Sequence, residues 1–416
     1  MKNDLHVQQL RQDALDICKT AIGDAVPNVA VARAIEGYSF LPGKVVVIAI
    51  GKAAWPMAKQ ASLSLGERLT KGLVVTKYHH SGGEIPNFRI IQAGHPIPDQ
   101  NSCLGAKIAL EYVADLTEND QVLFLISGGG SSLFELPLVP LPALMDITDQ
   151  LLKAGADIRE MNTIRKRLSG VKGGKFAQRC GNATVFSIVL SDVLGDSADM
   201  IASGPTAIDS STCEDALDIV RRYHIALSDE AKKFVQTETP KVLKNSHIQI
   251  VGGVSQLCAR AKERAKELGY HPLILTTWLS CEAREAGKFL AAMAKEYALK
   301  GEKLAFIAGG ETMVHVTGTG MGGRNQEMAL AAAPIISGLA NIVMISLGSD
   351  GTDGPTDAAG GMVDGTTADT LTSKGISVYD VLQNNDAYHG LKQCDGLVIT
   401  GATGTNVNDI SLVLVG

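Results

Sequence analysis

Short runs of apolar, largely β-branched residues recur along the chain, each closed by turn residues or a helical pattern, and they constrain its fold most. The first half contains five: Val45–Ile50, Leu73–Thr76, Arg89–Gln92, Val122–Ile126 and Val185–Leu190. Runs of this kind are typical of strands that are buried on both faces, and strands that alternate with helices indicate βα units in a mostly parallel sheet.

A second series of strand-like runs follows a more helical and polar stretch over residues 207–245. Its members are Ile248–Val251, Pro272–Thr276, Leu304–Ile307, Ile342–Leu347 and Leu397–Thr400. A chain of 416 residues is too long for one ordinary domain. We predict two three-layer α/β/α domains, residues 1–240 and 241–416, the first with a mostly parallel sheet. Ligands bind such folds where the carboxyl ends of strands meet, so an active site is expected in the inter-domain cleft.

Composition excludes several classes of protein. Hydrophobic residues make up 45% and charged residues 20%, which is typical of globular chains. The net charge of −6 without a basic stripe argues against a nucleic-acid partner. The seven cysteines are scattered, which favours reduced thiols in the cytoplasm over disulfides or a zinc site. The polar N-terminal segment indicates neither a signal peptide nor a membrane span. The oligomeric state stays open, with a homodimer among the options.

Two glycine-rich turns in the first half have the chemistry of anion sites. Gly51-Lys52 follows the first strand, where a helix start exposes amide groups and lysine adds a positive charge; a solvated lysine in a tight turn is the alternative. The next turn combines glycines, which let a ligand approach the backbone, with serines, which donate hydrogen bonds. Its predicted phosphate- or carboxylate-binding residues are Ser127, Gly128, Gly129, Gly130, Ser131 and Ser132.

Two further features of the first half carry charge. Residues 165–175 hold five cations, including Lys172, and the embedded Gly173-Gly174 argues against a plain solvated helix. We therefore place Lys172 in the anion-binding set. Asp192 ends the strand over 185–190, where a carboxylate suits metal binding or general-base work, or equally caps the next helix.

The second half offers two polar loops. Gly318, Gly320 and Gly323 satisfy the G-x-G-x-x-G pattern, although the acid expected about 20 residues later is not clearly present. Arg324 begins the following helix, and its planar guanidinium suits bidentate binding of a phosphate or carboxylate. Residues 349–357 contain three aspartates, which suit a hard cation such as Mg²⁺ or, alternatively, an Asx-turn loop. No Walker A motif is present.

Together these segments resemble the glycerate 2-kinase family whose C-terminal part is called the MOFRL domain. The matching segments cover the chain nearly end to end, in family order. They are GKAA at 51–54, GHPIPD at 94–99, SGGGSSL at 127–133, LSGVKGGKFA at 168–177, SDVLGD at 191–196, IASGPT at 201–206, GGET at 309–312, GMGGRNQE at 320–327, GSDGTDGPTDAAG at 348–360 and GTNVND at 404–409.

The resemblance implies that the N-terminal domain is Rossmann-like. It also implies ATP-dependent phosphorylation of D-glycerate to 2-phosphoglycerate, with Mg²⁺ or another divalent cation. Lys52 would then contact the transferring phosphate or the substrate, Asp192 would be the base, and Arg324 would steady negative charge. The remaining assignments are nucleotide contacts or polar lining at Glu311, Gly322, Gly323, Asn325 and Asn406, and metal binding at Asp350 and Asp353.

Two other functions stay open. A hydroxypyruvate reductase that uses NAD(P)H would fit the G-x-G-x-x-G pattern, and relatives of the family often carry that name. Against it, no dinucleotide fingerprint follows the strand Val45–Ile50. A non-enzymatic sensor of sugar acids would bind glycerate without turning over ATP.

Overall fold

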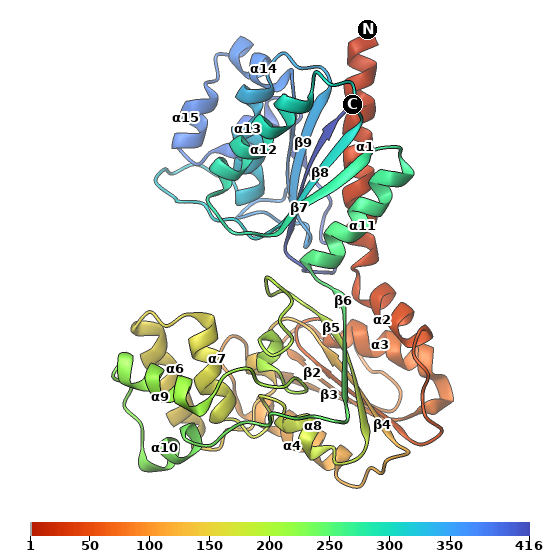
Figure 1. Ribbon diagram of the computed structural model, residues 1–416, viewed down its shortest axis with the longest axis vertical. Coiled ribbons are helices and arrows are strands. Elements are labelled where there is room, and N and C mark those ends of the chain that lie inside the picture. The colour runs from red at the N-terminus through yellow and green to blue at the C-terminus, as the bar shows by residue number, and fades with distance from the viewer. Residues whose placement is uncertain (1) are drawn as a thin grey trace. The chain divides into compact units, whose positions relative to one another are not determined.

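The computed structural model describes residues 2–416, with side chains from Leu5 onward, and it divides into two compact units. The N-terminal unit spans Pro27–Val251, and the C-terminal unit combines the residues up to Val26 with Gly252–Gly416 (Figure 1). Each unit contains one six-stranded sheet with helices on its faces, so the predicted α/β class with two sheets is confirmed.

The sheet of the N-terminal unit has the order β3-β2-β1-β4-β5-β6. The registered pairs β1–β2, β2–β3, β1–β4 and β4–β5 are all parallel, as predicted. The strands are β1 (Val45–Ile50), β2 (Leu69–Lys77), β3 (Phe88–Ala93), β4 (Gln121–Ile126), β5 (Thr184–Leu190) and β6 (Ser246–Gly252).

Burial on both faces explains why these strands have continuous apolar sequences. Successive side chains of a strand point to opposite faces. In β1, Val46 and Ile48 pack in the cluster that contains Ala106 and Ala109 of α4 (Gln100–Val113), whereas Val47 joins the cluster on the opposite face. That second cluster includes α2 (Pro27–Glu36) and α3 (Ala54–Leu65).

Short helices complete the N-terminal unit. Four of them, α6, α7, α9 and α10, share a separate hydrophobic cluster away from the sheet. The bounds are η1 (Gly66–Arg68), α5 (Gly130–Leu133), α6 (Leu141–Lys153), α7 (Ile158–Arg167), α8 (Lys175–Arg179), η2 (Ile201–Ser203), α9 (Cys213–Arg222) and α10 (Asp229–Val235).

The sheet of the C-terminal unit is mixed, with the order β11-β10-β9-β12-β8-β7. Only β7 and β8 are paired in parallel, whereas β12 runs antiparallel to both β8 and β9. The strands are β7 (His271–Leu279), β8 (Leu304–Gly310), β9 (Ile342–Gly348), β10 (Gly360–Asp364), β11 (Leu397–Val398) and β12 (Asp409–Val415).

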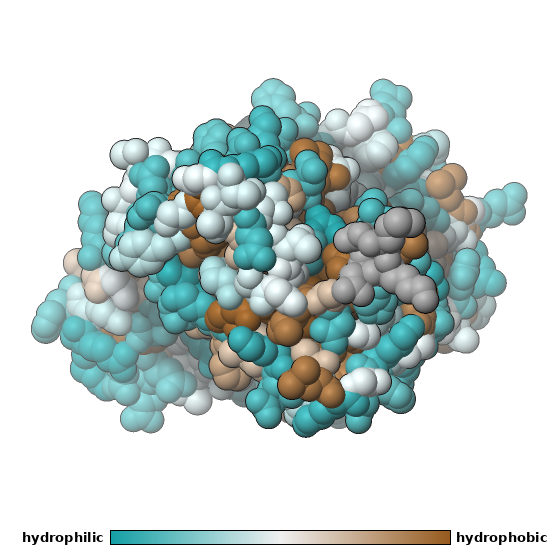
Figure 2. All heavy atoms as spheres, turned by 90° about the horizontal axis from the view of Figure 1, so that it is seen from above, coloured by the Kyte–Doolittle hydropathy of each residue, from teal (hydrophilic) through white to brown (hydrophobic). Residues whose placement is uncertain are grey.

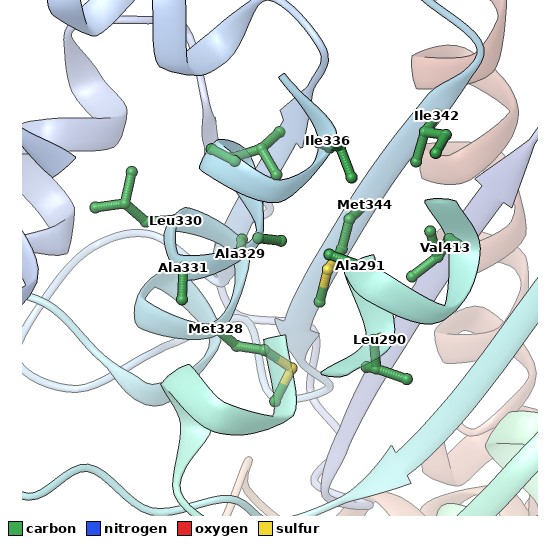
Figure 3. Packing of buried hydrophobic residues seen from close by; sticks show 14 of the residues in the cluster. Leu290, Ala291, Met328, Ala329, Leu330, Ala331, Ile336, Ile342, Met344 and Val413 are labelled. Atoms are coloured by element: carbon green, nitrogen blue, oxygen red, sulfur yellow. The ribbon is translucent and has the colours of Figure 1, made fainter. Parts of the chain in front are cut away.

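Helices cover both faces of this second sheet. Small alanines of α13 let it pack closely on α12, and Figure 3 shows Met328 and Leu290 from these helices near Met344 of β9 and Val413 of β12. The helices of the unit are α1 (Lys2–Asp24), α11 (Val254–Glu267), α12 (Ala283–Tyr297), α13 (Arg324–Ile336), α14 (Thr367–Ser373), α15 (Val378–Gln383) and α16 (Ala387–Lys392).

The division of the chain differs from the predicted single boundary between residues 240 and 241. Helix α1 packs on α11, β9 and β12 of the C-terminal unit through an apolar stripe that includes Leu10, Ala14 and Ile17. Ion pairs from Arg11 to Asp364 and from Arg264 to Asp16 reinforce this packing. The periodicity of a helix shows which face is buried, but it does not show on which sheet.

None of the helices in residues 2–416 combines the length and apolar character that a membrane crossing requires. The face in Figure 2 carries hydrophilic side chains interspersed with small hydrophobic groups.

Candidate active site

The carboxyl end of β1 and the carboxyl end of β4 form a topological switch point in the N-terminal unit. From β1 the chain proceeds outward to β2 and β3, and it then returns to β4 and β5 on the other side. The loops after β1 and β4 therefore lead to opposite sides, and such a switch point is the usual ligand site of open α/β sheets. Lys52 follows β1, and Ser127–Gly130 follow β4, so the fold brings these two predicted groups together.

Hydrogen bonds connect the two loops to each other. The amide of Lys52 donates to the Gly128 carbonyl at 2.9 Å, and the amide of Ala53 donates to Ser127 Oγ at 3.0 Å. Gly51 has a φ of +111°, and a Cβ there would lie 2.3 Å from Ser127 Oγ, so only glycine fits. Ser127 is buried and its hydroxyl is engaged within the protein, so its role is to brace the loops.

The glycine loop presents unpaired donors. In residues 2–416, the amides of Gly129, Gly130 and Ser131 donate to no acceptor. The exposed Lys52 side chain beside them makes no ion pair or hydrogen bond within the same residues. Successive free amides together with one ammonium group suit a phosphate or carboxylate. The hydroxyls of Ser131 and Ser132 are bonded to Ser203 and to the Gly129 carbonyl.

Asp192 follows β5, next to β4, and lies on the other side of the glycine loop. A Cβ at Gly128 would lie 2.2 Å from Asp192 Oδ2, so glycine at this position allows the carboxylate to approach the loop. Asp192 therefore belongs to the same cluster as Lys52 and Gly128.

His95 is a member of this cluster that the residue patterns did not predict. It follows β3, and a Cβ at Gly129 would lie 2.9 Å from its Cδ2 and 3.3 Å from Lys52 Cγ. A single histidine without partners at ligand spacing carries little signal, although His95 lies in the GHPIPD segment that carries the family resemblance. Asp99 ends that segment, caps α4 and accepts a hydrogen bond from Tyr78, so the loop that carries His95 is well anchored.

Lys172 does not join the cluster. It is fully buried, and its Nζ lies 2.6 Å from Glu135 Oε2 and donates to the Phe134 carbonyl at 2.9 Å. Its neighbours Lys166 and Arg167 are likewise buried, with Lys166 bonded to Asp199 and Asp209. The cation-rich segment thus neutralises buried carboxylates, and we leave Lys172 out of the candidate site.

Replacing Lys172 by methionine is expected to lower the free energy of unfolding by about 3–5 kcal/mol, because it leaves Glu135 as a buried charge without a close partner. Urea unfolding measures this change. The double variant Lys172→Met/Glu135→Met removes both charges and should recover most of the lost stability. A stable Lys172→Met single variant with impaired glycerate binding would instead return Lys172 to the anion-binding set.

In the C-terminal unit, Arg324 begins α13 and is held by Asp409 at the start of β12. Its Nε and Nη2 donate to the two carboxylate oxygens at 2.5 Å and 2.9 Å. The hydrogen bonds from Arg324 to Asp409 raise the pKa of Arg324, so the guanidinium stays charged. Nη1 lies 3.7 Å from the exposed Glu311, which is beyond hydrogen-bonding distance. This nitrogen is therefore available to a ligand.

Asp353 acts as a helix cap and does not fit the predicted role of metal ligand. It is buried, and its two carboxylate oxygens accept from the amides of Asn325 and Gln326 in the first turn of α13. Gly323 allows this approach, since a Cβ there would lie 2.2 Å from Asp353 Cγ. No group of three or more His, Cys, Asp or Glu side chains suited to a metal ion occurs within residues 2–416.

The pKa of Asp353 gives a testable pH dependence. Burial raises this pKa to about 6, against the lowering by the two helix amides. The folded protein therefore binds this proton more tightly than the unfolded chain, so the stabilisation is greatest at low pH. It is lost as the pH rises from about 4 to about 6, by an amount on the order of 2–3 kcal/mol. Between pH 4 and pH 7, the free energy of urea unfolding should fall more steeply with rising pH in the wild type than in Asp353→Asn. Equal slopes for the two proteins would contradict the assignment.

Asn325, Gly322 and Gly323 are structural in this arrangement. Asn325 is fully buried, and its amide group bonds to Asp353 and to Ser346. Gly322 lies against Ala387, since a Cβ there would lie only 3.2 Å from the Ala387 amide nitrogen. Among the polar residues predicted in this half, Glu311 and Asn406 are exposed, and Arg324 and Asp350 are partly exposed.

The G-x-G-x-x-G pattern does not form a dinucleotide cradle. In that cradle the glycines open a tight turn between a strand and a helix, and the backbone approaches the pyrophosphate. Here Gly318 and Gly320 instead pack against Asn384 and Asp386, where a Cβ would lie 2.3 Å and 2.4 Å from the nearest atoms. The close backbone approach is therefore made to another loop of the protein.

Comparisons with known proteins cover almost the whole chain. Residues 13–236 match the domain of unknown function DUF4147, and residues 304–409 match the MOFRL family. A D-glycerate 2-kinase of Thermotoga maritima is 51% identical over 98% of this chain and 99% of its own length. A putative hydroxypyruvate reductase of Agrobacterium vitis is 38% identical over 90% of this chain and its full length.

Solved structures agree with this match. The crystal structure of a glycerate kinase from Thermotoga maritima has a TM-score of 0.92 and 51% identity, over 98% of this chain and 100% of that chain. A protein of Pyrococcus horikoshii also has a TM-score of 0.92, with 42% identity over 98% of both chains.

Proposed function

The chain belongs to the glycerate 2-kinase family with a C-terminal MOFRL region, and on that premise we propose that it phosphorylates the 2-hydroxyl of D-glycerate with ATP. The observation that carries phosphoryl transfer is the set of unpaired donors at the switch point, Lys52 and the amides of Gly129–Ser131. The choice of glycerate rests on the family.

Phosphoryl transfer needs positioning and neutralisation of charge more than covalent chemistry from the protein. Lys52 and the glycine loop hold an anionic group, either the glycerate carboxylate or the transferring phosphate. Arg324 supplies a fixed positive charge, because Asp409 orients its guanidinium and leaves Nη1 for a ligand. The N-terminal unit thus carries the anion-binding turns, and the C-terminal unit carries the oriented guanidinium.

Asp192 and Asp350 have the carboxylates that suit the two remaining roles. Asp192 approaches the glycine loop and orients the acceptor hydroxyl as a proposed base. Asp350 is partly exposed, and its Oδ1 accepts from the Thr352 amide, which leaves Oδ2 for a divalent cation whose other ligands would come from water and phosphate. When bound, such a cation would screen the negative charge of the nucleotide phosphates. Glu311 lies 3.7 Å from Arg324, and we propose that it and the exposed Asn406 serve as polar lining.

The test is product identification. Purified protein is incubated with D-glycerate, ATP and Mg²⁺, and ³¹P NMR distinguishes 2-phosphoglycerate from 3-phosphoglycerate. Formation of 2-phosphoglycerate is the expected result. Glycerate binding without ATP turnover would instead favour the sugar-acid sensor, and 3-phosphoglycerate would place the transfer at the other hydroxyl.

The reductase alternative has a specific observation in its favour, the name of the Agrobacterium vitis relatives. The packing of Gly318 and Gly320 argues against it. The oxidation of NADH by hydroxypyruvate, measured as a loss of absorbance, tests the reductase directly.

We also propose a cytoplasmic location, which the seven free cysteines support. The homodimer stays a prediction, which sedimentation analysis can test.

A further inference from the structure

We propose that His95 is a catalytic residue of the phosphoryl transfer, whose Nε2 accepts the proton of the glycerate 2-hydroxyl. This inference rests on the proposed function and adds a role that no residue pattern predicted. It stands on the position of the imidazole, on its lack of partners in the protein and on the charges around it.

The position of His95 places its ring at the anion-binding loop. A Cβ on Gly129 would lie 3.1 Å from His95 Nε2, so the nitrogen edge of the imidazole faces the loop backbone. Gly129 has a φ of +85° and no side chain, and both features leave this space to the ring. The same space touches Lys52, the residue proposed to hold the substrate or phosphate anion.

The ring nitrogens of His95 have no hydrogen-bond partner in residues 2–416. Two other histidines do have one: His80 Nδ1, in the loop after β2, lies 3.3 Å from the Lys52 carbonyl, and His389 Nδ1, in α16, lies 2.6 Å from Asp386. A half-buried polar group that lacks a partner in the protein is costly unless water or a ligand supplies one. The geometry therefore points to a ligand hydroxyl at His95.

The charges around His95 keep its ring neutral. Burial and the neighbouring Lys52, Lys77 and His80 lower the pKa of His95 below its usual 6.5. These groups come from the turn after β1, the end of β2 and the loop after β2. Two carboxylates belong to the surrounding loops: Asp99, which is bonded to Tyr78 and Ser102, and Asp192, which approaches Gly128. At neutral pH the imidazole thus has a free lone pair and can accept a proton.

The step balances with the reactants of the proposed function. The bond between the 2-oxygen of glycerate and its hydrogen breaks, and the proton moves to Nε2. The same oxygen forms a bond to the terminal phosphorus of ATP, while the bond from that phosphorus to the bridging oxygen breaks and ADP leaves. The imidazolium then returns the proton to solvent.

His95 and Asp192 are alternative acceptors, because they approach adjacent residues, Gly129 and Gly128, of one loop. The two assignments differ in pH dependence. His95 as the base gives an acid limb in kcat/KM below pH 6.5, because its pKa is lowered, whereas a carboxylate base gives one near the ordinary range of aspartate. Asp192 would then orient the substrate or the loop.

The test compares His95→Asn with His79→Asn in the full-length protein. His79 is exposed on a neighbouring loop and has a φ of +66°, a conformation that asparagine adopts readily, so this control should retain wild-type rates. We expect His95→Asn to lower kcat/KM for glycerate by about 10²-fold or more, mainly through kcat, and to lose the acid limb that His95 gives the wild type.

The wild type is assayed first, so that failure of the proposed function is separated from failure of this inference. If the wild type forms no phosphoglycerate, the proposed function is wrong. If the wild type is active and His95→Asn retains both its rate and its acid limb, the inference is overturned. His95→Gln, which keeps a polar group nearer the position of Nε2, provides the same readout if the asparagine variant does not fold.

Discussion

Replacing Lys52 by methionine is expected to lower kcat/KM for glycerate by about 10²–10³-fold, the usual effect of removing one preorganised donor from a site of developing charge. The amine is exposed at the carboxyl end of β1 and, within residues 2–416, forms no ion pair with a carboxylate. Its charge is therefore available to an anion on the glycine loop, where the amides from Gly129 to Ser131 are also unpaired.

The same variant should fold normally, because no structural contact of the amine is lost. We expect its free energy of unfolding to stay within about 0.5 kcal/mol of the wild type. Lys59→Met, a change of the same kind on α3, is the matched control and should leave the rate unchanged. Steady-state kinetics and urea unfolding of the three proteins measure both effects. A Lys52→Met enzyme with a rate within a few-fold of the wild type would remove Lys52 from the mechanism.

Replacing Arg324 by lysine should also cost about 10²–10³-fold in kcat/KM, although the charge is kept. The guanidinium uses two nitrogens to bind both oxygens of Asp409 and has Nη1 left for a ligand. A lysine ammonium is one point charge. The buried Asp409 carboxylate would hold it, and the ligand would lose its partner.

Arg264→Lys in the same unit is the control for this second prediction. Arg264 forms ion pairs with Asp16 and Glu267 at the protein surface, so the change should have little effect on stability and leave the rate intact. Measuring kcat/KM for glycerate and for ATP separately shows which of the two substrates Arg324 contacts. If Arg324→Lys kept the wild-type kcat/KM for both substrates, the proposed contact between Arg324 Nη1 and a ligand would be wrong.

The contrast between Lys52 and Lys172 shows how far residue patterns predict the site. Both lysines lie in glycine-rich segments that resemble the same family, yet one is exposed and the other is paired with Glu135 in the interior. Asp350 and Asp353 in the loop after β9 differ in the same way: Asp350 is partly exposed, whereas Asp353 is buried and caps α13, 28 residues away in sequence. No local pattern contains the partner that decides the role of each side chain.

The sequence by itself determined the α/β class, the parallel sheet of the N-terminal unit and the position of Lys52, the glycine loop and Asp192 at the ends of strands. These follow from local physics, since strands buried on both faces need continuous apolar runs and tight turns after them need glycine. Only the tertiary structure decided the mixed strand directions of the second sheet, the attachment of α1 to it, the burial of Lys172 and the position of His95 beside Gly129. Each of these depends on which distant segments become neighbours, and hydrophobic periodicity records that a face is buried without recording what covers it.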